Sequence, residues 1–250
     1  MATRSLHIGI DYVGTGSELH GCVNDAENIS EYLVSRGLVD ASNSVILREA
    51  KCSDILRALF SLAAETTREN VSNVFISFSG HGTYITDYSG DELDGRDECI
   101  CPSDYATAGV LRDDEMNDIF SFFNKDTSIT LLMDCCHSGS CMDLPYRYLS
   151  RTSVVQECSG DCHPRLTMIS GCADQQTSAD AYDEGRREYT GAMTSSLLDS
   201  LKVEPELLKD AFGLLTCMRV LLVERKMTQV PQLSTSAPAT STAPFFSVLP

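Results

Sequence analysis

The segment SITLLMDCCHSGSC, residues 128–141, joins a largely apolar run to a cluster of reactive side chains. The run has the length and composition of a fully buried strand, and it ends at Asp134. Two adjacent cysteines, Cys135 and Cys136, then lead into a turn of small residues. In sheets of parallel strands, ligands and reactive groups gather beyond the carboxyl ends of the strands. The segment therefore predicts an α/β protein with a site at the end of this strand.

Strand and helix patterns alternate on both sides of this segment. Strands are expected at 6–12, 43–49, 73–80, 128–133 and 165–172. Helices are expected at 24–37, 52–67, 113–123, 191–201 and 205–226. For the first helix, Asn24 or Asp25 is the expected cap and Gly37 the stop. Loops are expected at 83–98, which is polar and acidic, and at 234–244, which is low in complexity. The alternation predicts a mostly parallel sheet with helices on both faces.

Length and composition indicate a single globular domain. The chain has 250 residues, and one hydrophobic core is the common outcome at this size. It contains no run of about 18 apolar residues to suggest a membrane span, and no long apolar segment near the N-terminus to suggest a secretory signal. We therefore expect an intracellular, cytoplasmic protein whose eleven cysteines are reduced thiols.

The formal net charge of −17 is informative about partners. It disfavours nucleic acid and anionic membrane surfaces, because both repel an acidic protein. It favours cationic ligands, namely basic peptides or metal ions. The alternative explanation is a well-solvated acidic surface with no particular ligand.

A second strand pattern also ends in a reactive side chain. His81 follows the apolar run at 73–80 and lies between Gly80 and Gly82, which leave its ring accessible. A cysteine thiolate is a nucleophile, and a nearby imidazole can take its proton and later protonate a leaving amine. His81 and Cys136 at neighbouring strand ends predict such a pair. The backbone N–H groups of Gly82 and Cys136 would hold the oxyanion.

Other interpretations of the cysteine cluster are weaker. A phosphatase loop needs an arginine six residues after the cysteine, where Met142 stands. A zinc site built from Cys135, Cys136, His137 and Cys141 is disfavoured, because adjacent cysteines chelate poorly and no CxxC pair supports it. A redox sensor using Cys135 and Cys136 is disfavoured because a disulfide between adjacent cysteines is strained.

The motifs ISFSGHG (76–82) and LLMDCCHSGS (131–140) resemble the histidine and cysteine motifs of metacaspases, the caspase-like cysteine peptidases of clan CD, family C14. The histidine motif precedes the cysteine motif by about 50 residues, as in caspase-type enzymes. Further segments match in the same order, so that the resemblance runs from about Leu6 to Leu249. These segments are IGIDYVGTGSELHGCVNDAENI (8–29), GVLRDDEM (109–116), SGCADQQTSAD (170–180), GAMTSSLL (191–198) and PQLS (231–234).

The resemblance implies a three-layer α-β-α caspase-like fold with a mostly parallel central sheet. It implies the type I order of regions, with a large catalytic region at 1–145 and a small region at 164–250. Residues 146–163 would form a modest connecting loop within one compact domain. The resemblance also implies a monomer.

By the same resemblance, the substrate pocket falls on Cys22, Asp25, Ser79 and Asp134. A carboxylate at the buried end of a strand needs a cation or hydrogen-bond donors, and an Arg or Lys side chain of a substrate would supply them. A caspase pocket would instead need basic residues, which these motifs lack. Three alternatives stay open: a helix cap for Asp25, an orienting partner of His81 or a clamp on the backbone for Asp134, and a packing residue for Cys22.

The resemblance implies calcium as the cofactor, with ligands at Asp97, Asp113, Asp114 and Asp143. Calcium takes six to eight oxygen ligands, often from separate loops. The acidic segment 87–98 lacks the residue order of an EF-hand. The alternative for Asp113 and Asp114 is a favourable charge in the first turn of a helix.

The leading hypothesis is a calcium-activated cysteine endopeptidase, a zymogen that cleaves basic protein or peptide substrates after Arg or Lys. Cys136 and His81 would form its catalytic dyad, and calcium would relieve repulsion among the acidic residues and switch the enzyme on. The alternative is a catalytically weak caspase-fold protein that acts as a regulatory or interaction module.

Overall fold

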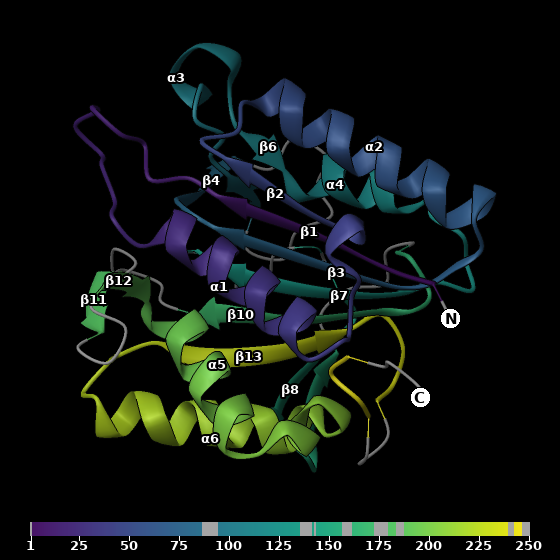
Figure 1. The fold of residues 1–250 in the computed structure, drawn as a ribbon, viewed down its shortest axis with the longest axis vertical. Coiled ribbons are helices and arrows are strands. Elements are labelled where there is room, and N and C mark those ends of the chain that lie inside the picture. Colours follow the sequence, from purple (N-terminus) through teal and green to yellow (C-terminus); the bar gives the residue numbers. More distant parts are fainter. Residues whose placement is uncertain are drawn as a thin grey trace.

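A computed structural model describes residues 2–86, 95–135, 142, 144–156, 162–172, 180–183, 188–239 and 243–246. Its centre is an eight-stranded sheet with the order β2-β1-β3-β7-β10-β13-β8-β9 (Figure 1). The strands are β1 (Ala2–Gly9), β2 (Ser44–Arg48), β3 (Val71–Ser79), β7 (Ser128–Asp134), β8 (Tyr146–Ser150), β9 (Ser153–Gln156), β10 (Leu166–Cys172) and β13 (Val230–Thr235). The five strands from β2 to β10 are parallel, whereas β13, β8 and β9 pair antiparallel.

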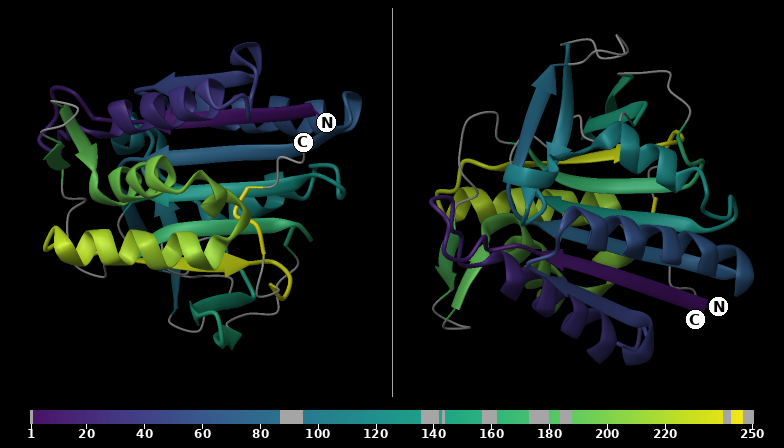
Figure 2. Two further views of the ribbon diagram at one scale, coloured as in Figure 1. Left: turned by 60° about the horizontal axis from the view of Figure 1, so that its bottom comes forward. Right: turned by 90° about the horizontal axis from the view of Figure 1, so that it is seen from above.

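Helices cover both faces of the sheet, as Figures 1 and 2 show. One face carries α1 (Cys22–Ser35), α5 (Ala192–Val203) and α6 (Ala211–Glu224). The other face carries α2 (Cys52–Arg68) and α4 (Asp113–Phe120). The predicted three-layer α-β-α architecture with a mostly parallel sheet is therefore confirmed.

Smaller elements lie at the edges of these layers. They are the three-stranded sheet β4 (Gly82–Thr86), β5 (Arg96–Ile100) and β6 (Leu111–Arg112), the hairpin β11 (Asp180–Asp183) and β12 (Glu188–Gly191), the short helix α3 (Tyr105–Ala108), and the 3₁₀ turns Ala41–Asn43 and Pro205–Lys209.

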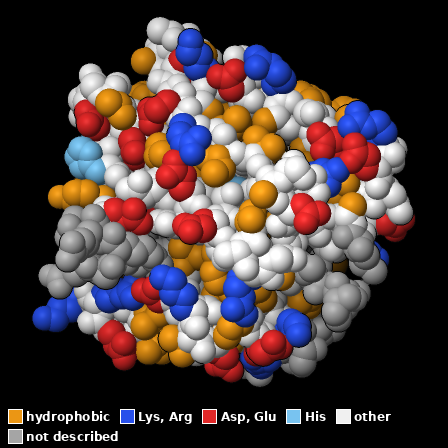
Figure 3. Space-filling view, viewed as in Figure 1, with side chains coloured by type: hydrophobic (Ala, Val, Ile, Leu, Met, Phe, Trp, Pro, Cys, Tyr) orange, Lys and Arg blue, Asp and Glu red, His pale blue; other side chains and the backbone are white. Residues whose placement is uncertain are grey.

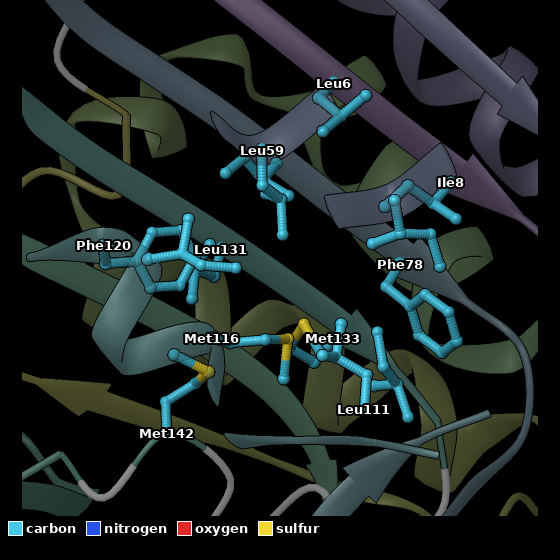
Figure 4. Close-up of a cluster of buried hydrophobic side chains, with 14 of the residues drawn as sticks. Leu6, Ile8, Leu59, Phe78, Leu111, Met116, Phe120, Leu131, Met133 and Met142 are labelled. Carbon is cyan, nitrogen blue, oxygen red and sulfur yellow. The ribbon is translucent and has the colours of Figure 1, made fainter. Parts of the chain in front are cut away.

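The central strands are largely buried on both faces because each face is covered by helices. On the face toward α2 and α4, side chains from the central strands β1, β3, β7 and β10 and from both helices form one buried cluster (Figure 4). Leu131 of β7 lies in this cluster and is 1% exposed. Its replacement by alanine would cost about 2–5 kcal/mol of folding free energy, since a cavity would remain. This packing fixes β3 and β7, whose ends carry the site.

Helix α2 shows why the sequence pattern predicted the helices well. Its buried residues Ile55, Leu59 and Leu62 recur at helical spacing and form one apolar stripe. At its start, Asp54 accepts a hydrogen bond from the backbone N–H of Lys51 at 3.4 Å, which satisfies one of the donors that a helix leaves open.

Several boundaries differ from the expectations. The first strand begins at Ala2 and ends at Gly9, earlier than the expected 6–12. The expected acidic loop at 83–98 contains most of β4 and the start of β5, while residues 87–94 lie outside the described part. The expected helix at 205–226 is interrupted at Asp210, which caps α6 through the backbone N–H of Gly213.

Two regions expected as loops contain strands instead. Residues 146–163 include β8 and β9, which extend the sheet. The start of the low-complexity segment 234–244 belongs to β13. Across the described part of the chain, no helix has the length and apolarity needed to cross a membrane. Figure 3 shows acidic side chains spread among basic ones on one face of the molecule.

Candidate active site

Strands β3 and β7 are parallel neighbours, and their carboxyl ends carry the two predicted halves of the site. Ser79 at the end of β3 lies directly opposite Asp134 at the end of β7. The backbone N–H of Gly80 donates to the carbonyl of Asp134 at 3.3 Å, so the loop that carries His81 begins beside β7. Cys136, the predicted nucleophile, follows two residues after Asp134 and lies outside the described residues.

Cys135 is the last residue described before that gap. It is 2% exposed and belongs to the cluster that faces α2 and α4. Cys135 therefore packs in the core, whereas the predicted nucleophile is its neighbour in sequence.

Three hydrogen bonds hold His81 at the end of β3. Its backbone N–H donates to the hydroxyl of Tyr12 at 2.8 Å, and its carbonyl accepts from the N–H of Cys101 at 3.0 Å. The imidazole Nε2 lies 2.7 Å from the carbonyl oxygen of Ser17. Because a carbonyl oxygen only accepts, Nε2 carries a proton and Nδ1 is the acceptor nitrogen of the neutral ring. This tautomer can take a proton from a thiol at Nδ1.

Tyr12 supports His81 from the loop that follows β1. Its ring lies 4.6 Å from the imidazole, centroid to centroid, and its hydroxyl donates to the carbonyl of Cys101 at 2.7 Å. Burial raises the pKa of Tyr12 far above its usual value, so the hydroxyl stays protonated. Gly80 permits this close approach, since a β-carbon there would lie 2.9 Å from the Tyr12 hydroxyl.

The four residues of the predicted pocket are all buried, and the structure brings them together. The hydroxyl of Ser79 donates to Asp25 Oδ2 at 2.7 Å. Burial, followed by the nearby charge of Asp25, raises the pKa of Cys22 well above its usual range. The Cys22 thiol is therefore neutral and not a nucleophile.

The two pocket carboxylates meet at the start of helix α5. The backbone N–H of Gly191 lies 3.0 Å from both carboxylate oxygens of Asp25. Asp134 Oδ2 accepts from the backbone N–H of Thr194 at 2.9 Å and from its hydroxyl at 2.8 Å. These contacts join residues that are 166 and 60 positions apart in the sequence.

The expectation that Asn24 or Asp25 caps the first helix is wrong. Helix α1 begins at Cys22, and its first donors are satisfied from the preceding loop, where Asp11 Oδ1 accepts from the N–H of Cys22 at 2.8 Å and of Val23 at 3.4 Å. The expected stop is confirmed, because α1 ends at Ser35, shortly before Gly37. Since Asp11 supplies the cap, the carboxylate of Asp25 points to the pocket instead.

The predicted metal ligands Asp97, Asp113 and Asp114 lie around Arg112. The Arg112 guanidinium is 3.6 Å from one carboxylate oxygen each of Asp97 and Asp114. Asp113 directly follows Arg112 and is the first residue of α4. Burial, followed by the charges of Asp113 and Asp97, raises the pKa of Cys99 to about 12. The three acids are thus brought to one end of β5, β6 and α4.

The fourth predicted ligand, Asp143, lies outside the described residues. Its neighbour Met142 donates its backbone N–H to Asp113 Oδ2 at 3.4 Å and accepts from the Asn117 amide at 2.9 Å. In the described part of the chain, no group of three or more His, Cys, Asp or Glu side chains forms a metal-holding cluster. The donor types nevertheless fit calcium, which prefers carboxylate oxygens, and Asp97 and Asp113 are buried carboxylates.

Comparison with known proteins assigns the chain to a family. Residues 3–145 match the family model described as metacaspase, peptidase C14 domain. The chain belongs to the metacaspase family. Metacaspase-1B of Aspergillus terreus is 32% identical to it over 291 aligned positions, covering 94% of this chain and 75% of the relative. Metacaspase-3 of Trypanosoma cruzi is 34% identical over 268 positions, covering 94% and 71%. The metacaspase family identifies the chain as a cysteine peptidase.

Solved structures share the fold of this metacaspase. A crystallised protein of Geobacter sulfurreducens superposes with a TM-score of 0.68 at 23% identity, covering 98% of both chains. The Drosophila initiator caspase Dronc superposes with a TM-score of 0.57 at 11% identity, covering 94% of this chain and 80% of that one. The chain therefore has a caspase fold, as the sequence predicted.

Sequence reasoning missed four residues of the site. Tyr12, Ser17, Gly191 and Thr194 all contact a predicted site residue. Tyr12, Gly191 and Thr194 fall within segments that resemble the family, yet no spacing rule linked them to His81 or to the acids. Ser17 acts through its backbone carbonyl, so its side chain carries no signal.

Proposed function

We propose that this metacaspase is a calcium-activated endopeptidase that cleaves after Arg or Lys, with Cys136 as nucleophile and His81 as general base and acid. The observation that carries the proposal is the pair of buried carboxylates, Asp25 and Asp134, beside the loop of His81.

The pocket chemistry favours a cation. Asp25 Oδ2 and Asp134 Oδ2 both approach the α-carbon of Gly191 so closely that a β-carbon there would clash with each. Two carboxylates this close repel one another when both are ionised. A guanidinium or ammonium group of the substrate would relieve the repulsion, and a guanidinium can bond carboxylates through several N–H donors.

The catalytic steps follow from the His81 tautomer. Nδ1 of His81 takes the thiol proton of Cys136, and the thiolate attacks the scissile carbonyl carbon. The backbone N–H groups of Gly82 and Cys136 stabilise the oxyanion. The C–N bond then breaks as His81 gives its proton to the leaving amine. Water, deprotonated by His81, hydrolyses the thioester and restores the thiol.

Through all of these steps the carbonyl of Ser17 keeps its hydrogen bond to Nε2. This contact orients the ring and stabilises the imidazolium that forms when Nδ1 takes a proton, in the role that a carboxylate plays in a serine-protease triad.

Calcium is expected at Asp97, Asp113, Asp114 and Asp143. A bound calcium ion would offset the mutual repulsion of these carboxylates. Asp113 also accepts the backbone N–H of Met142, and Met142 follows Cys136 by six residues. A calcium ion held by Asp113 would act on the position of Met142, close in sequence to the nucleophile, and this is the basis for proposing an activation switch.

Hydrolysis of paired fluorogenic peptides tests the proposal. Peptides ending in Arg, Lys or Asp are offered to wild type and to Cys136→Ala, with calcium and with a chelator. Cleavage after Arg and Lys that needs both calcium and Cys136 is the expected result. Cleavage after Asp would overturn the pocket assignment, and activity that survives chelation would remove calcium. No cleavage of any peptide in calcium would favour the regulatory module.

A further inference from the structure

We propose that Thr194 and Gly191, at the start of helix α5, are positioning residues that keep the carboxylates of Asp134 and Asp25 aimed at the substrate cation and thereby set the preference for a charged side chain. The inference rests on the proposed Arg/Lys specificity and adds two residues to the pocket that carries it.

Thr194 holds Asp134 through two donors at once. Its backbone N–H and its hydroxyl both bond to the same oxygen, Oδ2, at 2.9 and 2.8 Å. Both side chains are 1% exposed, so water does not compete for these bonds. Hydrogen bonds to the ionised form of a buried carboxylate favour that form. A single threonine thus fixes the direction of the Asp134 carboxylate and favours its ionised form.

Gly191 holds Asp25 through its backbone N–H, which lies 3.0 Å from each carboxylate oxygen. A β-carbon at Gly191 would lie 2.6 Å from Asp25 Oδ2 and closer still to Asp134 Oδ2. No side chain larger than hydrogen therefore fits between the two carboxylates in this arrangement. Gly191 lets both carboxylates reach the same space, where a single cation can contact both.

Helix α5 adds a further electrostatic contribution. It spans Ala192–Val203, and Gly191 is its N-cap. The first N–H groups of a helix carry the positive end of its dipole and lack partners within the helix. The carboxylates of Asp25 and Asp134 accept hydrogen bonds from such N–H groups, those of Gly191 and Thr194. The helix start therefore stabilises two neighbouring negative charges that would otherwise repel one another.

The alternative is a purely structural role, in which the same bonds only join distant parts of the chain. The two roles differ in what they do to discrimination. A structural tie would change stability or overall activity for every substrate alike. A positioning role would change the rate for a cationic substrate far more than for a neutral one of the same shape.

Peptides ending in Arg or in citrulline make this distinction, because citrulline is the neutral isostere of arginine. The ratio of kcat/KM for the two peptides is measured for wild type, Thr194→Val and Thr194→Ser. Thr194→Val removes one charge-assisted hydrogen bond to Asp134, so the ratio should fall about tenfold, mainly through KM. Thr194→Ser keeps the hydroxyl and should retain most of the wild-type ratio.

Two control variants make the same substitutions as Thr194→Val and Gly191→Ala, but at residues outside the pocket. Thr66→Val removes the hydroxyl of a fully buried helical threonine that bonds to Ala63 and Asn124. Gly213→Ala places a β-carbon 2.7 Å from Asp210 Oδ2, where Gly213 N–H already donates to that carboxylate. It is the counterpart of Gly191→Ala. Thermal unfolding is recorded for all variants.

The expected result is a lower Arg-to-citrulline ratio in Thr194→Val and Gly191→Ala, with an unchanged ratio in both controls. An unchanged ratio in a folded Thr194→Val variant would overturn the inference while leaving the proposed function standing. An equal fall in Thr66→Val would also overturn it, since the effect would then be one of stability. A wild type that does not prefer Arg to citrulline would overturn the proposed specificity itself.

Discussion

The hydroxyl of Tyr12 accepts the backbone N–H of His81 at 2.8 Å, and the two rings lie 4.6 Å apart. The same hydroxyl donates to the carbonyl of Cys101, whose own N–H bonds to the carbonyl of His81. One phenol therefore links the loop after β1, the histidine loop and the end of β5.

Removal of this hydroxyl should impair catalysis more than substrate binding. In Tyr12→Phe, the buried carbonyl of Cys101 and the partly buried N–H of His81 lose their partner, and the buried group alone costs about 1–3 kcal/mol. His81 should then be held less firmly, so that kcat falls about tenfold or more while KM changes little. Steady-state kinetics with an Arg peptide measures both constants.

Tyr148→Phe is the matched control for this variant. Tyr148 is also buried and its hydroxyl also accepts a backbone N–H, from Ala239 at 2.6 Å, but it lies on β8. The Tyr148→Phe variant should be less stable than wild type and should keep the wild-type kcat. A Tyr12→Phe enzyme whose kcat stays within twofold of wild type would contradict a role in holding His81.

The pocket carboxylates should act on affinity for the cation. Asp134→Asn keeps the shape of the side chain and removes its charge, so KM for an Arg peptide should rise about 10- to 100-fold. Asp25→Asn should act in the same direction, and neither should affect a citrulline peptide as strongly. Asp210→Asn is the control, because Asp210 pairs with Arg151 and caps α6 away from the site. A KM for Arg that is equal in Asp134→Asn and wild type would count against the pocket.

His7 should make the fold sensitive to acid. The side chain is fully buried on β1, with Nδ1 2.8 Å from the hydroxyl of Ser77. Burial lowers the pKa of His7 from 6.5 to about 3. Below pH 6.5 the unfolded chain binds a proton that the folded chain does not, so stability should fall as pH drops from 6.5 toward 3. At pH 5, the protonation of His7 in the unfolded chain lowers the free energy of unfolding by about 2 kcal/mol.

Urea unfolding at pH 7.5, 6 and 5 measures this dependence. His7→Asn removes the titrating group and should flatten the fall, although it starts from a lower stability. His20→Asn alters an exposed histidine and should follow the wild-type slope. Equal slopes for wild type and His7→Asn would show that other groups cause the acid sensitivity.

Calcium should stabilise the protein through the acids around Arg112. At 100 times its dissociation constant, a bound ion adds about 2.7 kcal/mol to the free energy of unfolding. Thermal unfolding should therefore shift upward by several degrees in calcium for wild type, and much less for Asp113→Asn. Asp118→Asn, an exposed acid on the same helix, should retain the full shift.

Removal of the Arg112 guanidinium, which would compete with calcium for the acids, tests the calcium site independently. Arg112 contacts Asp97 and Asp114, so Arg112→Gln should bind calcium more tightly in titration calorimetry. The absence of any heat of binding in wild type, together with no thermal shift, would refute a calcium site.

The central fold followed from the sequence because local patterns and global structure agree there. The runs that became β3 and β7 are rich in apolar residues, are buried on both faces and end in polar residues, which is typical of parallel strands under helices. The edge elements were missed for the opposite reason. Strands β8, β9 and β13 pair antiparallel at or near the sheet edge, are partly exposed, and lack a clear apolar run. Short strands that pair antiparallel at a sheet edge therefore give no strong hydrophobic pattern in a single sequence.

From the sequence, a site residue could be predicted only where it lies in a recognisable motif. His81, Ser79 and Asp134 stand at strand ends, where position indicates a function. The donors that hold the carboxylates come from Gly191 and Thr194, far along the chain, and part of their contribution is backbone N–H. The same holds for the cap of α1, because Asp11 reaches the helix from a separate loop. Such contacts depend on tertiary structure and not on local spacing.

The position of helix α5 late in the chain has a consequence for synthesis. The carboxylates of Asp25 and Asp134 are translated well before Gly191 and Thr194, which hold them in the folded protein. A nascent chain that has emerged only as far as β7 contains both acids without the helix that supports them. The pocket is therefore completed only after most of the polypeptide has left the ribosome, and the proposed preference for a cationic side chain cannot be established before then.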